Sequence, residues 1–121
     1  MRVIAKSGLV YIPDWNGNKK EQEQIKIHYR YLTGPEYDRF VGIGNVKFDE
    51  EGNPIGGFEF KLDKEGMVRE GIEKIENLYV DDVKIETAEE LCKRPELAGL
   101  YKEFADFYLE INREPDKKKL K

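Results

Sequence analysis

The chain has 121 residues, a formal charge of −4, 38% charged and 39% hydrophobic residues. This length corresponds to one domain, and the balance of residues is typical of a compact fold and not of a disordered chain. The single cysteine excludes an internal disulfide, and no apolar stretch approaches the roughly 20 residues that span a membrane. We therefore expect a cytoplasmic protein with no membrane partner.

The charge is unevenly distributed along the chain. Residues 114–121 carry four lysines against Glu114 and Asp116, a net of +2, which leaves −6 on the remainder. An acidic body repels nucleic-acid phosphates, so we expect no nucleic-acid partner. We predict a basic, disordered tail at 114–121, although the lysines could instead contact an acidic partner.

Strand signals open the chain. Residues 9–12 form a short apolar run, and Asn16-Gly17 is a strong turn signal because both residues tolerate positive φ. In residues 24–32, apolar positions alternate with polar ones, which predicts a strand with one packed and one wet face. The apolar positions are Ile25, Ile27, Tyr29 and Tyr31.

The middle of the chain predicts a helix, a hairpin and a second helix. Thr33 and Glu36 match a capping box before a short helix that ends near Val41. Residues 46–48 and 55–62 predict a hairpin around an acidic turn, with one face packed through Phe58, Phe60 and Leu62. Helical spacing over residues 64–77 predicts a helix with the stripe Val68, Ile72, Ile75 and Tyr79.

The last third is predicted to be mainly helical. Residues 78–80 and 83–85 flank Asp81-Asp82 as a small hairpin, and Thr87 with Glu90 forms a second capping box. That helix ends before Pro95, which suits the first turn of a final amphipathic helix. Its apolar positions are Leu97, Leu100, Tyr101, Phe104, Phe107, Tyr108 and Ile111.

Together these elements predict one α+β domain over residues 1–113. A small antiparallel sheet from the N-terminal half would be covered by helices, including the C-terminal amphipathic helix.

No pattern predicts a catalytic, cofactor-binding or metal-binding residue, so we expect a non-enzymatic protein. His28 lies on the polar face of its strand, and Cys92 lacks a CxxC partner, which favours surface and core roles. Gly42-Ile43-Gly44 runs from a helix into a strand, the reverse of a dinucleotide loop. Residues 49–53 miss the glycine position of a calcium loop and indicate an acidic turn.

Aromatic and apolar residues are the candidates for partner binding. Trp15 lies in a polar turn, where it could anchor a partner or pack back over the sheet. The stripe of the last helix could dock on another helix, or it could be intramolecular core. The stripe candidates are Phe104, Phe107, Tyr108 and Ile111.

The order of segments resembles small proteins of phage and prophage tail modules, among them tail assembly chaperones. The resemblance is carried by residues 14–18, 23–29, 32–33 with Glu36, 72–80, Ile85 and 88–91, and by the closing helix. The Asp81-Asp82 turn departs from it, since a glycine is expected there.

The resemblance implies a protein of the bacterial host cytoplasm that binds the tape measure protein while tail-tube subunits assemble. Its partners would be the tape measure or tail-tube protein, or further copies of itself. A structural subunit of the tail tube or connector, and a small host-interaction or regulatory module, are the alternatives.

Overall fold

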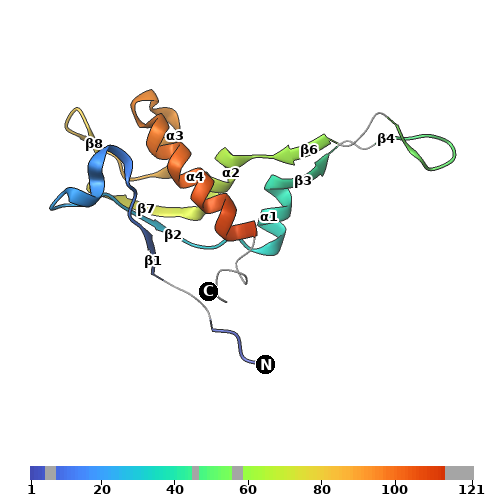
Figure 1. Ribbon diagram of the computed structural model, residues 1–121, viewed down its shortest axis with the longest axis horizontal. Helices are drawn as coiled ribbons and strands as arrows, with labels where there is room; N and C mark the ends of the chain where they lie inside the picture. The colour runs from blue at the N-terminus through green and yellow to red at the C-terminus, as the bar shows by residue number, and fades with distance from the viewer. Residues whose placement is uncertain (5–7, 45–46, 56–58, 114–121) are drawn as a thin grey trace.

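The computed structural model describes residues 1–4, 8–44, 47–55 and 59–113, and it has the predicted α+β architecture (Figure 1). The predicted tail at 114–121, and Val46 and Phe58 of the predicted hairpin, lie outside the described residues. The helices are α1 (Gly34–Phe40), α2 (Lys64–Gly71), α3 (Ala88–Lys93) and α4 (Ala98–Arg113), with 3-10 turns η1 (Trp15–Lys20) and η2 (Pro95–Leu97). The strands are β1 (Leu9–Tyr11), β2 (Lys26–Tyr29), β3 (Val41–Gly44), β4 (Lys47–Phe48), β5 (Pro54–Ile55), β6 (Glu59–Leu62), β7 (Ile72–Glu76), β8 (Tyr79–Val80) and β9 (Val83–Lys84).

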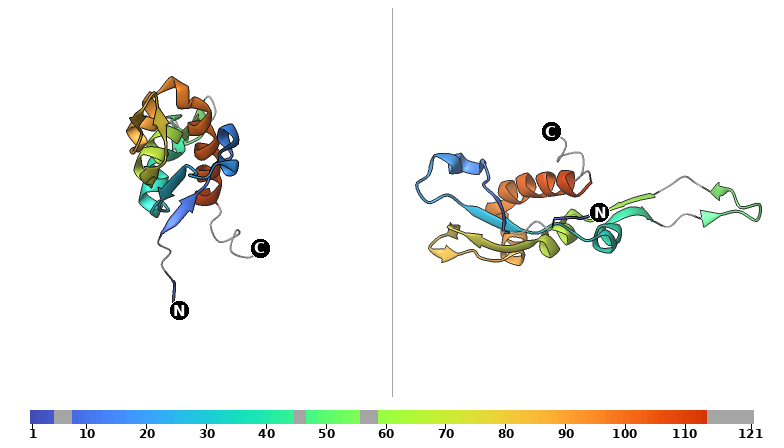
Figure 2. Two further views of the ribbon diagram at one scale, coloured as in Figure 1. Left: turned by 90° about the vertical axis from the view of Figure 1, so that its left-hand side faces the viewer. Right: turned by 90° about the horizontal axis from the view of Figure 1, so that it is seen from below.

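The main sheet is antiparallel, in the order β1-β2-β7, and α4 lies across one face of it (Figures 1 and 2). Along β2 the predicted alternation is confirmed: Ile27 and Tyr29 are buried, whereas Lys26 is exposed. Tyr29 packs edge-on against Phe104 of α4, with ring centroids 6.1 Å apart. The apolar face of the sheet and the apolar stripe of α4 thus form one core.

The predicted start of the last helix and its predicted apolar face are both found in the structure. Pro95 opens the 3-10 turn η2, which leads directly into α4. The large buried side chains of this stretch recur at three- and four-residue spacing and are Leu97, Leu100, Phe104, Tyr108 and Ile111; the small Ala105 is buried beside them. Among the described residues no helix combines the length and apolar character needed to cross a membrane.

The helix predicted over residues 64–77 is wrong in its second half. The helix α2 ends at Gly71, and Ile72 begins strand β7, which pairs with β2. Ile72 and Ile75 are buried by the sheet contact and not by a helical stripe. Tyr79, the last member of the predicted stripe, is 58% exposed. The β-branched residues gain more from pairing with β2 than from another helical turn, and tertiary contacts override the local pattern.

Two turns use left-handed backbone, and the sequence predicts this for the first of them, at Asn16-Gly17. Asn16 and Gly17 have φ of 50° and 73° within η1. Asp81 and Asp82 have φ of 46° and 67° between β8 and β9. Aspartate tolerates this region through its short polar side chain, so the β8–β9 turn forms without the glycine that the resemblance leads one to expect.

A β-hairpin arm projects from the body on the side opposite β8 and β9 (Figures 1 and 2). We call the two strand pairs β3–β6 and β4–β5 the arm. Val41 pairs with Leu62 at its base, and Phe48 pairs with Pro54 near its end. The arm is longer than the predicted hairpin, because residues 41–44 continue from α1 as a strand. Leu62 was expected on a packed face, yet it is 49% exposed.

Candidate interaction surfaces

The predicted docking stripe on α4 is occupied within the molecule. Phe104 and Tyr108 are fully buried, and Ile111 is 6% exposed. The Tyr108 hydroxyl donates to the backbone carbonyl of Arg30, and Phe107 stacks on Tyr11 with ring centroids 4.2 Å apart. The packing favours the core alternative for Phe104, Tyr108 and Ile111, because a partner would reach them only if α4 left the sheet. Phe107 is partly buried, and its contact with a partner stays a prediction.

Trp15 takes an intermediate position. It is partly buried and packs against the core from η1. A β-carbon at Gly99 would come within 2.9 Å of the indole nitrogen, so α4 approaches the Trp15 ring closely. The ring also borders a hollow of about 390 Å³ shared with Asn16 and Tyr79. The body of the protein therefore covers most of the Trp15 side chain. A contact between Trp15 and a partner stays a prediction.

The residues with catalytic potential are engaged in structural contacts. His28 Nε2 lies 2.8 Å from a Glu76 carboxylate oxygen across the β2–β7 pair, and this hydrogen bond holds the pKa of Glu76 below its usual value. Cys92 is partly buried, and burial raises the pKa of its thiol, which favours the unreactive protonated form. Within the described ranges no cluster of His, Cys, Asp or Glu has the arrangement of a metal site.

A polar network fixes α1 against the body. The Arg30 guanidinium donates two hydrogen bonds of 2.8 Å to the carboxylate of Glu36 and one of 3.2 Å to Glu70. Glu36 also completes the predicted capping box with Thr33. The bidentate contact with Arg30 holds the pKa of Glu36 far below its usual range. The first turn of α1 is therefore held in place, and this positions Tyr37, the next residue along the helix.

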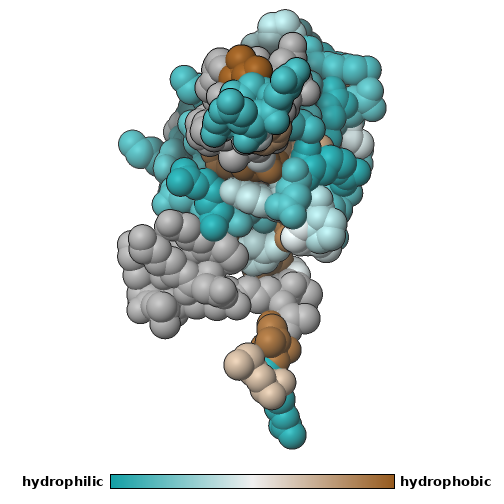
Figure 3. All heavy atoms as spheres, turned by 90° about the vertical axis from the view of Figure 1, so that its right-hand side faces the viewer, coloured by the Kyte–Doolittle hydropathy of each residue, from teal (hydrophilic) through white to brown (hydrophobic). Residues whose placement is uncertain are grey.

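The end of the arm is apolar and acidic at once. Phe48 is 61% exposed and Ile55 is 54% exposed. Figure 3, which faces the arm, shows hydrophobic surface there beside hydrophilic surface. The connecting turn is ordered by Asp49, whose carboxylate accepts hydrogen bonds from the N–H groups of Glu51 and Asn53 at 3.0 and 2.8 Å. The Asp49 carboxylate is thus used within the turn, as expected for an acidic turn.

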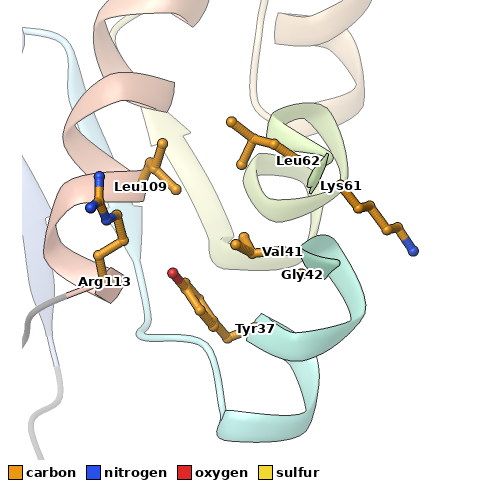
Figure 4. Close-up of a pocket in the computed structure, with 7 residues that line it drawn as sticks. All are labelled: Tyr37, Val41, Gly42, Lys61, Leu62, Leu109 and Arg113. Atoms are coloured by element: carbon orange, nitrogen blue, oxygen red, sulfur yellow. The ribbon is translucent and has the colours of Figure 1, made fainter. Parts of the chain in front are cut away.

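An apolar groove of about 390 Å³ lies at the base of the arm (Figure 4). Tyr37 reaches it from α1, Leu62 from β6 and Leu109 from α4. Arg113 stands on the wall that α4 forms, whereas Lys61 is directed away from the hollow. Among the described residues that line it, two are basic and none is acidic. These lining residues are Tyr37, Val41, Gly42, Lys61, Leu62, Leu109 and Arg113.

Sequence reasoning did not find this groove or the arm end. The groove residues come from three stretches of the sequence, the consecutive α1 and β3, then β6, then α4, so no local pattern connects them. The apolar residues of the arm were visible in the sequence, but alternation cannot tell whether the chain covers its own apolar face. Comparisons with family models, curated proteins and solved structures give no match for this chain.

Proposed function

We propose that this protein is a non-enzymatic assembly component that binds other proteins through the arm. The observation that carries the proposal is the exposure of Phe48 and Ile55 near the end of a two-stranded ribbon that leaves the body. An isolated two-stranded ribbon is marginally stable in water, and it gains stability when a hydrophobic face is covered. Exposed apolar groups on such an element favour a protein partner as the cover.

The resemblance to small phage and prophage tail-module proteins gives this proposal a particular setting, the assembly of a phage tail. Within that setting the arm favours a structural subunit, such as a tail-tube or connector component, that contacts neighbouring subunits. A tape measure chaperone remains the alternative. It would have to hold its client by a surface other than the α4 stripe, because that stripe packs on the sheet.

A capture experiment with matched variants tests the proposal. The arm variant carries Phe48→Asp and Ile55→Asp, and the control variant carries Tyr79→Asp and Val83→Asp on the exposed β8–β9 hairpin. Each tagged protein is expressed in its native cells, and co-purified proteins are quantified by mass spectrometry. We expect the wild type and the control to retain the same partners and the arm variant to lose them. Equal capture by all three would overturn the proposal.

The genes beside the reading frame test the tail setting independently. A tail-tube gene upstream and a very long, helix-rich reading frame downstream are the expected neighbours. Metabolic or regulatory neighbours would remove the tail setting while leaving arm-mediated binding to be judged by the capture experiment.

A further inference from the structure

We propose that the partner of the arm is a second copy of this chain, whose groove receives Phe48 at the end of the arm. Ile55 lies on the opposite face of the two-stranded ribbon, because it pairs with Lys47 whereas Phe48 pairs with Pro54. This inference rests on the proposed function and names the partner. The chain carries both halves of such a contact: an exposed apolar end on the arm and an apolar groove at the arm's base. The groove volume of about 390 Å³ is in the range of pockets that take up small apolar groups, and a phenyl ring fits well within it.

The two surfaces carry opposite charge. Beside Phe48, the turn presents the exposed carboxylates of Glu50 and Glu51. The groove wall presents Arg113, which has no ion pair with any residue that the structure describes. Glu50 and Glu51 likewise form no ion pair within the described part of the chain. Docking would place apolar groups together and bring these charges near one another, which favours this pairing over one of like charges.

The arm cannot fill the groove of its own chain. Val41 and Leu62 belong both to the groove and to the first strand pair of the arm, so the groove sits where the arm begins. The arm then runs away from the body and from α4 (Figure 2). The contact must therefore join two molecules.

A contact between two different surfaces of the same chain can close or propagate. If two copies exchange arms reciprocally, both grooves are filled and the assembly is a symmetric dimer. If each arm enters the groove of a different copy, the contact propagates into a ring or an open filament, as a subunit of a repeating structure requires.

Complementation between two defective variants tests the inference. The arm variant carries Phe48→Asp and Ile55→Asp, and the groove variant carries Leu62→Glu and Arg113→Glu, at exposed positions. Sedimentation velocity is measured over a wide concentration range for each variant and for their equimolar mixture. Circular dichroism establishes that each variant is folded. The Tyr79→Asp and Val83→Asp variant serves as the control for added charge.

We expect the wild type and the control to form species that grow with concentration, and each defective variant to associate at least about tenfold more weakly, as loss of a central contact residue predicts. The mixture should give a heterodimer and nothing larger, because it contains one intact arm and one intact groove per pair. A wild type that stays monomeric, or a mixture without the heterodimer, would overturn the inference. If the arm variant still loses its partners in the capture experiment, the proposed function stands and only the identity of the partner is refuted.

Discussion

Gly71→Ala tests the junction where helix α2 becomes strand β7. An alanine β-carbon at this position would lie 2.5 Å from Cε2 of Tyr108, and the hydroxyl oxygen would be nearer still. Tyr108 is fully buried and cannot swing aside, since its hydroxyl is bonded to the Arg30 carbonyl. Overpacking of a core costs about 1–3 kcal/mol, and contact with several ring atoms places this substitution near the upper end.

Alanine also favours the helical conformation by up to about 1 kcal/mol relative to glycine, which offsets part of the clash. The expected net loss in the free energy of unfolding is therefore about 2 kcal/mol. Urea denaturation followed by far-UV circular dichroism measures this loss as a lower midpoint with an unchanged slope. Gly34→Ala is the matched control, because no atom lies within 4 Å of the added carbon; it should be neutral or stabilise by up to about 1 kcal/mol.

The sign of the Gly71→Ala effect separates two structures. In a continuous helix over residues 64–77, Gly71 would be an interior helical position, and alanine would stabilise the protein by about 1 kcal/mol. A gain in stability would therefore refute the helix-to-strand junction and the packing of Tyr108 against it.

Three further predictions concern buried polar groups and pH. Asn18→Ala should cost about 2–3 kcal/mol in thermal or urea unfolding, because Asn18 is 2% exposed and its side chain bonds the N–H and carbonyl of Ile25. A loss below about 0.5 kcal/mol would contradict that role. Burial raises the pKa of the Tyr108 hydroxyl above its usual value of 10.0. As the pH rises, the unfolded chain therefore loses the hydroxyl proton before the folded chain does. The free energy of unfolding should fall above pH 10 by up to about 1.4 kcal/mol per pH unit for this group. Tyr108→Phe should make the alkaline slope shallower, and an unchanged slope would count against the buried hydroxyl. Arg30 lowers the pKa of Glu36 from 4.5. The stabilisation by this ion pair is therefore present above pH 4.5 and is lost as the pH falls through the lowered pKa. Glu36→Gln should flatten the acid limb of a stability–pH profile, and an identical acid limb would refute the Arg30 contact.

Local signals in the sequence predict the parts of the fold that depend on neighbouring residues. The capping box at Thr33 and Glu36 forms as predicted, because both hydrogen bonds involve residues within three positions of each other. The stripe of α4 is confirmed for the same reason, since helical periodicity and one packed face suffice to predict it.

The errors come from contacts between distant residues. Ile72 and Ile75 are three positions apart, a spacing that suits a helix, but pairing with β2 decides their structure. Leu62 looks like a packed strand residue, and only the absence of a covering element in the described chain leaves it at the surface. The groove combines Tyr37 and Leu109, which no sequence pattern brings together.

Site-specific photo-crosslinking tests the central claim, that the arm is the surface by which this protein binds others. A photoreactive phenylalanine analogue replaces Phe48 in one variant and Tyr79 in another, two exposed aromatic positions on different hairpins. After irradiation of living cells, adducts are resolved by size and identified by mass spectrometry. The account predicts a discrete protein adduct at position 48 and none at position 79. No adduct at position 48, or the same adducts at both positions, would contradict it.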